Sequence, residues 1–196
     1  MINRRFDLKN GDVVAIAGYR AGCGKTDLAL ALAEQICEQY KVYVVTNSRD
    51  FRVTEYGRFC LNEMGIPAAQ FGIGQEPSED IQVTIHDGVI PESATKIIYI
   101  VPTPLADTNL GINDKQHIEF CRQVRIRIND VYNVAVEFIE EHEIGLMHSR
   151  QRDLKQTDWI VIRELEKQLL TGTDVGNTRR FIREVKNKDW DYVHKF

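Results

Sequence analysis

Glycine, lysine and threonine residues follow one another at a spacing suited to holding a phosphate group. The segment VVAIAGYRAGCGKTDLALA, residues 13–31, joins an apolar run to an alanine- and leucine-rich run through a glycine-rich turn. Gly22 and Gly24 let a loop curl so that backbone N–H groups face an anion, and the following helix adds its positive dipole end. Lys25 would then reach the β- and γ-phosphates of a nucleoside triphosphate, and the hydroxyl of Thr26 would bind Mg²⁺.

The spacing of this loop differs from the usual pattern G-x-x-x-x-G-K-[ST] by one residue. That pattern requires glycine at position 19, where the chain has Tyr19, and Gly18 lies one residue earlier. We therefore expect a longer loop in which Gly18 ends the strand; the alternative is a glycine-rich turn that binds nothing. Cys23 could be a reactive thiol, because a helix N-terminus lowers the pKa of a thiol, but we favour a small filler residue. The expected nucleotide-binding residues are Gly22, Cys23, Gly24, Lys25, Thr26 and Asp27.

The elements around the loop alternate between strands and helices in the first half of the chain. Apolar runs predict strands at residues 13–17, 41–46, 81–85, 96–101, 144–149 and 158–164, and helical spacing predicts helices at 26–40, 55–65 and 115–142. Residues 179–196 resemble a hairpin. This order predicts one α/β domain over residues 1–196, with a mainly parallel, helix-flanked sheet and antiparallel strands at its C-terminus. Ligands of such sheets bind at the carboxyl ends of the strands, where the loop falls.

The composition is that of an ordinary globular protein and limits the partners of the chain. Its net charge is −4 and its pI is near 5.8, so contact with nucleic acid would require a local basic patch. The four cysteines are scattered without a C-x-x-C pair, which argues against zinc ligation and a disulfide framework. No apolar run reaches the length of a membrane span, and we expect a cytoplasmic protein.

Taken together, the motifs resemble the RecA-like P-loop ATPase core, most closely the C-terminal motor domain of DnaB-type replicative helicases. LKNGDVVAIAGYRAGCGKTDLALAL, residues 8–32, is similar to the opening of that domain, and KIIYIV resembles its Walker B strand. Residues 128–153 resemble its nucleotide-sensing helix, strand and Ser-Gln-x-x-Arg element. The resemblance implies ATP and Mg²⁺ as cofactors and assembly of identical chains into a ring or filament on single-stranded DNA.

Two acidic residues that the resemblance implies are missing from their usual positions. The Walker B aspartate should directly follow KIIYIV, where the chain has Pro102-Thr103-Pro104, so Asp107 is the nearest carboxylate for the metal beside Thr26. The glutamate that orients the attacking water should follow the second strand, and Asp50 or Glu55 would have to substitute for it. Because phosphoryl transfer depends on the placement of metal and water, weak hydrolysis or nucleotide binding without hydrolysis is an alternative function.

The remaining expected site residues are basic. By resemblance, Lys186 and Lys188 would reach the γ-phosphate bound to a neighbouring subunit, which makes them catalytic together with Lys25 and Asp50. Arg150, Arg152 and Lys155 form a dense basic loop that either contacts single-stranded nucleic acid or is a solvated connection. The run RQVRIR, residues 122–127, is better explained as the solvent-facing side of a helix.

A group-transfer enzyme is the second interpretation. GKTDLALALAE followed by NSRDFR is similar to the opening of tRNA dimethylallyltransferases, with Asn47 where those enzymes have their aspartate. A nucleotide kinase also fits, since Arg49, Arg52 and Arg58 could bind the phosphate of a monophosphate acceptor.

Overall fold

A computed structural model of the chain describes residues 6–63, 70–75, 77, 80–104, 113–144 and 147. These residues belong to two compact units. The first contains the described residues up to Ser48 and from Phe71 onward, and the second contains those between Arg49 and Gln70. The prediction of a single domain over residues 1–196 stays a prediction.

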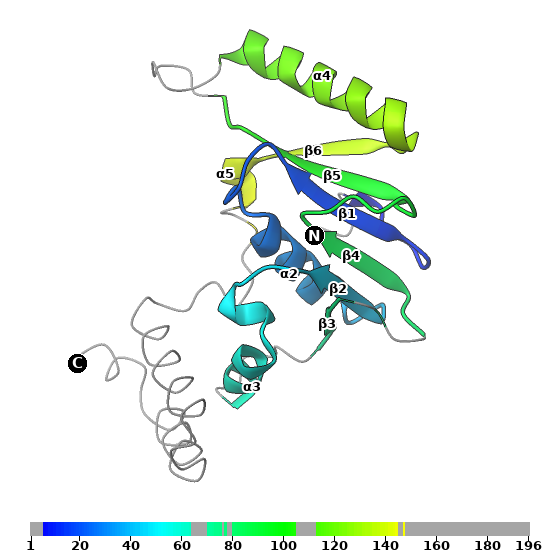
Figure 1. Ribbon diagram of the computed structural model, residues 1–196, viewed down its shortest axis with the longest axis vertical. Coiled ribbons are helices and arrows are strands. Elements are labelled where there is room, and N and C mark those ends of the chain that lie inside the picture. Colours follow the sequence, from blue (N-terminus) through cyan, green and yellow to red (C-terminus); the bar gives the residue numbers. More distant parts are fainter. Residues whose placement is uncertain are drawn as a thin grey trace, which may run out of the picture. The chain divides into compact units, whose positions relative to one another are not determined.

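The first unit is built on a six-stranded parallel sheet, which confirms the predicted α/β class (Figure 1). Its strand order is β3-β2-β4-β1-β5-β6, and every neighbouring pair is parallel. The strands are β1 (Val13–Gly18), β2 (Val42–Thr46), β3 (Gly72–Gly74), β4 (Val83–Asp87), β5 (Lys96–Val101) and β6 (Val136–Glu140). Strand β1 is central, so the loop that follows it has β4 on one side and β5 on the other.

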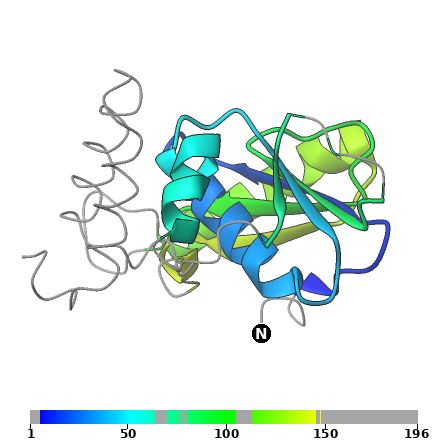
Figure 2. The same ribbon diagram turned by 90° about the horizontal axis from the view of Figure 1, so that it is seen from below.

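Two helices cover opposite faces of this sheet (Figure 2). Helix α2 (Lys25–Ile36) contributes an almost wholly buried run of leucine and alanine to one face. Helix α4 (Asp114–Tyr132) packs Ile128 against Ala15, Ala94 and Ile97 on the other face. Ala94 lies between β4 and β5, so this connection crosses the face of β1 without forming a helix.

The edge strand β3 is short and contains two glycines beneath an aromatic ring. A Cβ atom at Gly72 would lie 2.4 Å from Cδ2 of Tyr43, and one at Gly74 would lie 2.3 Å from its phenol oxygen. Because no side chain fits at either position while Tyr43 keeps its place, glycine is required there by packing. This strand was not expected from the sequence.

The second unit is described by its own elements, the 3₁₀ turn η1 (Phe51–Val53) and helix α3 (Glu55–Glu63). Helix α3 confirms most of the helix expected at 55–65. The chain enters this unit shortly after β2 ends and returns to the sheet at β3.

The sequence prediction was wrong between residues 133 and 144. The expected helix at 115–142 ends at Tyr132, because Asn133 adopts the left-handed conformation at φ 50° and caps it. The chain then forms β6, whose Val136, Phe138 and Ile139 are of the β-branched and aromatic types enriched in strands. The short helix α5 (Glu141–Ile144) includes Ile144, the residue at which the strand 144–149 was expected to begin. The strands expected at 158–164 and 179–196 lie outside the described residues.

Candidate functional site

The glycine-rich loop lies between the end of β1 and the start of α2, as the sequence predicts. Gly22 and Gly24 have φ values of +73° and +90°, a backbone region that other residues rarely adopt. Gly24 precedes the first helical residue, and its carbonyl accepts a 2.9 Å hydrogen bond from Leu28. The N–H groups of the first turn of a helix have no partner within the helix, so this geometry suits an anion such as a phosphate. Asp27 lies in this first turn.

The side chain of Lys25, the first residue of α2, reaches back across the glycine-rich loop. Its Nζ donates a 2.9 Å hydrogen bond to the carbonyl of Arg20 and lies 3.8 Å from Sγ of Cys23. On its other side, a Cβ atom at Gly88 would lie 3.5 Å from Cε of Lys25. The ammonium group is therefore held at the loop, between its backbone and the residue that follows β4.

Cys23 explains why Gly18 stands one residue earlier than the usual pattern. A Cβ atom at Gly18 would lie 2.4 Å from Sγ of Cys23, closer than any packed side chain tolerates. The Cys23 side chain is 1% exposed. This burial supports the interpretation of Cys23 as a filler residue, in which the thiol occupies the space above a glycine that ends β1.

A carboxylate that sequence reasoning missed lies beside Thr26. Asp87 is the last residue of β4, and its Oδ2 accepts 2.7 Å hydrogen bonds from the hydroxyls of Thr26 and Thr46. Hydroxyl and carboxylate oxygens are the ligands that Mg²⁺ prefers, and a P-loop threonine paired with a strand-end aspartate holds this metal in nucleoside triphosphatases. Thr26 and Asp87 can therefore supply ligands to one Mg²⁺ ion.

The sequence contained a signal for Asp87. The run VTIHDG places an acidic residue and a glycine at the end of a segment rich in β-branched residues, and Gly88 has φ +83°. The strand expected at 81–85 ends two residues before the observed end of β4, and the RecA-like resemblance places the metal carboxylate after β5 instead. Asp107, the residue proposed there, lies outside the described residues.

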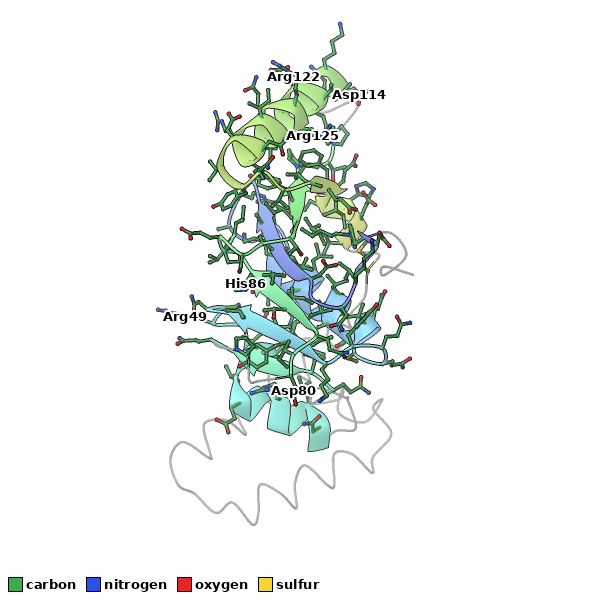
Figure 3. The ribbon with its side chains drawn as sticks, turned by 90° about the vertical axis from the view of Figure 1, so that its right-hand side faces the viewer. Arg49, Asp80, His86, Asp114, Arg122 and Arg125 are labelled. Carbon is green, nitrogen blue, oxygen red and sulfur yellow. The ribbon has the colours of Figure 1, made fainter. Side chains whose placement is uncertain are left out.

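His86, labelled in Figure 3, directly precedes Asp87 on β4. Successive side chains of a strand point to opposite faces of the sheet, so His86 and Asp87 face apart. Burial lowers the pKa of His86, which favours the neutral imidazole.

Asp50, the proposed catalytic carboxylate, forms an ion pair within the second unit. Its two oxygens accept hydrogen bonds of 2.9 Å from Nε and 2.6 Å from Nη2 of Arg52. Burial by itself raises the pKa of Asp50, but the hydrogen bonds and positive charge of Arg52 outweigh this effect and lower it. The carboxylate is therefore kept ionised by a bidentate partner.

Tyr19 and Arg20, at the start of the phosphate loop, form hydrogen bonds to Glu141 of helix α5, which follows β6. Glu141 accepts a 2.5 Å hydrogen bond from the phenol of Tyr19 and a 2.7 Å bond from Nη2 of Arg20. Nε of Arg20 also donates to the Tyr19 oxygen at 2.8 Å. Burial and the hydrogen bond to Glu141 raise the pKa of Tyr19, so the phenol stays protonated and remains a donor.

Helix α4 carries the basic run RQVRIR on its surface, as expected. Arg122 pairs with Glu119 at 2.7 Å one turn earlier, and the guanidinium of Arg125 lies 5.2 Å from the centre of the Phe138 ring. Both arginines project from α4 (Figure 3). These contacts support a structural rather than a catalytic role for this run.

Polar side chains also gather at the carboxyl ends of β5 and β6. Nδ1 of His142 lies 3.2 Å from Glu140 and 3.1 Å from the hydroxyl of Thr103, while Nε2 of His117 lies 3.9 Å from Glu140. Within the described part of the chain, no group of three or more histidine, cysteine, aspartate or glutamate residues is arranged to hold a metal ion.

Several of the expected site residues cannot be placed. The basic loop residues Arg150, Arg152 and Lys155 lie outside the described residues, and so does the pair Lys186 and Lys188.

Searches for related proteins found no matching family model and no matching curated protein. Of the helices that the structure describes, none is both long enough and apolar enough to cross a membrane.

Proposed function

We propose that this chain binds ATP with Mg²⁺ at the loop after β1 and cleaves the bond to its γ-phosphate. The observation that carries the proposal is the 2.7 Å hydrogen bond between the Thr26 hydroxyl and the Asp87 carboxylate. It brings a hydroxyl from the first turn of α2 and a carboxylate from the end of β4 together beside the phosphate loop, as a magnesium–triphosphate site requires.

Each loop residue has a role in this proposal. The N–H groups of the backbone from Gly22 to Thr26 would hold the phosphates, and Lys25 would leave the carbonyl of Arg20 to reach the β- and γ-phosphates. Thr26 and Asp87 would hold Mg²⁺, which supplies positive charge against the oxygens of the transferring phosphoryl group. Phosphoryl transfer needs little more than such positioning and charge stabilisation.

The resemblance to RecA-like motors suggests water as the phosphoryl acceptor. In this form of the proposal the chain assembles into a ring or filament on single-stranded DNA and couples hydrolysis to movement. Arg150, Arg152 and Lys155 would contact the DNA, and Lys186 and Lys188 would complete the site of a neighbouring chain. This assignment rests on the sequence motifs.

A nucleotide kinase is the second candidate, and two observations favour it. The metal carboxylate lies on β4, whereas the RecA-like resemblance places it directly after β5. In addition, the second unit carries Arg49 and Arg58, and such side chains bind phosphate groups, whereas Arg52 is already paired with Asp50.

One experiment tests ATP binding and separates the two candidates. ATP binding and turnover would be measured for the full chain with Mg²⁺, alone, with single-stranded DNA and with each nucleoside monophosphate, beside the Lys25→Ala variant. Stimulation by DNA supports the motor, and formation of a diphosphate from one monophosphate supports the kinase. Tight binding without turnover would support the nucleotide-binding alternative. ATP binding that is weak in the wild type or unchanged by Lys25→Ala would overturn the proposal.

A further inference from the structure

Thr46 and Asp87 occupy the last rung of the pairing between two neighbouring strands. Thr46 ends β2 and Asp87 ends β4, and their α-carbons are register partners in this parallel pair. Because register partners point to the same face of a sheet, the threonine hydroxyl is brought to the aspartate by the strand pairing itself. Thr26 reaches the same carboxylate from a different element, helix α2.

The hydrogen bonds around Thr46 fix the direction in which its proton points. The backbone N–H of Ser48 donates to Oγ1 of Thr46 at 3.0 Å, so this contact uses the hydroxyl as an acceptor. A hydroxyl has one proton to donate, and the other hydrogen bond of Oγ1 to a described residue is the 2.7 Å bond to Oδ2 of Asp87, which can only accept. The Thr46 proton is therefore directed to Asp87.

This arrangement leaves the two oxygens of Asp87 in different environments. Oδ2 accepts from both threonine hydroxyls, whereas no hydrogen bond from the described residues reaches Oδ1. A carboxylate with one oxygen held from two sides cannot rotate without breaking both bonds. Outer groups that orient a metal ligand in this way contribute substantially to metal affinity.

We propose that Thr46 is a positioning residue for magnesium: its hydroxyl holds the Asp87 carboxylate in place as a ligand for the ion at Thr26. This inference rests on the proposed function. It assigns the end of β2, where the RecA-like resemblance implies a water-orienting glutamate, to the organisation of the metal ligand. Thr46 acts through Asp87 and needs no contact with the nucleotide.

The test is the Mg²⁺ dependence of ATP binding in Thr46→Val, which keeps the shape of the side chain and removes its hydroxyl. We expect the Mg²⁺ concentration for half-maximal ATP binding to rise about tenfold, at the lower end of the cost of losing an outer-shell partner. ATP binding without divalent ions should not change. Thr46→Ser keeps the donor and should restore the wild-type Mg²⁺ dependence. Thr84→Val, the same change earlier on β4, is the matched control.

The possible outcomes separate the inference from the function on which it rests. A Thr46→Val protein with the Mg²⁺ dependence of the wild type overturns the positioning role while ATP binding stands. Thr46→Ser as impaired as Thr46→Val also overturns it, because the hydroxyl would then not be the group that matters. Failure of the wild type to bind ATP with Mg²⁺ overturns both proposals. Thermal unfolding of each variant shows that it is folded, and Thr46→Ala replaces Thr46→Val if valine prevents folding.

Discussion

Ile144 packs directly against the α-carbon of Gly24. A Cβ atom at Gly24 would lie 3.2 Å from both Cδ1 and Cγ2 of Ile144, so the isoleucine occupies the space that a side chain would need. Gly24 also has a φ of +90°. Two independent constraints, one from the backbone and one from packing, therefore act on the residue that precedes the phosphate-binding lysine.

These constraints predict that Gly24→Ala lowers both stability and ATP affinity. The left-handed backbone costs a residue with a Cβ atom about 1–2 kcal/mol, and displacement of Ile144 adds to this cost. Gly11→Ala separates the two contributions, because Gly11 has a φ of +91° but nothing within 4 Å of its Cβ position. Denaturant unfolding of both variants checks the prediction, which is wrong if Gly24→Ala is no less stable than Gly11→Ala.

Asp87→Asn tests the proposed metal ligand. An amide keeps the size of the side chain but loses the negative charge, so we expect Mg²⁺-dependent ATP binding to weaken by at least the roughly 100-fold that marks the upper end for loss of an outer-shell partner. Asp80→Asn is the control, since Asp80 is an exposed loop residue paired with Lys41 at 3.8 Å. If both variants bind ATP with the same Mg²⁺ dependence, Asp87 is not a ligand of the metal.

Gly18 and Cys23 should behave as a coupled pair. Gly18→Ala places a methyl group against Sγ of Cys23, and such overpacking costs about 1–3 kcal/mol. Cys23→Ala removes the sulfur, so the double variant should be more stable than the sum of the single changes predicts. A double-mutant cycle of unfolding free energies measures this coupling. If the two changes in unfolding free energy simply add, the loop moves to relieve the contact between the new methyl group and Sγ, and the predicted coupling is wrong.

The pH dependence of Asp50 should reverse when Arg52 is replaced. In the wild type the pKa of Asp50 is lowered, so its pair with Arg52 contributes stability above the unfolded pKa near 3.8, and this stability is lost as the pH falls through the folded pKa. In Arg52→Met the hydrogen bond from the backbone N–H of residue 52 remains, but burial is the largest effect on Asp50 and raises its pKa once the guanidinium is gone. The carboxylate then costs stability as the pH rises above the unfolded value. A carbon NMR titration of the Asp50 carboxyl group measures its pKa in both proteins. The same midpoint in Arg52→Met as in the wild type would contradict the predicted rise.

Local patterns predicted the elements that carry their own signal. The apolar runs of β1, β2 and β5, the helix α2 and the glycines of the loop lie close to where the sequence places them. Non-local relationships were missed. Asp87 meets Thr26 because β4 pairs with β1, and Tyr19 meets Glu141 across 122 residues. Strand β6 was missed because the helical spacing was extended through Asn133, although asparagine is one of the few residue types that end a helix in the left-handed conformation.

The two glycines of β3 have a consequence for how copies of this chain could associate. An exposed sheet edge is a template for strand addition and aggregation, and proteins counter this hazard with very short edge strands. Strand β3 spans only Gly72–Gly74, and its glycines lie against the Tyr43 ring. Continuation of the sheet from one copy into the next is therefore disfavoured at this edge. A ring or filament of these chains is therefore expected to use another surface than the β3 edge as its joint.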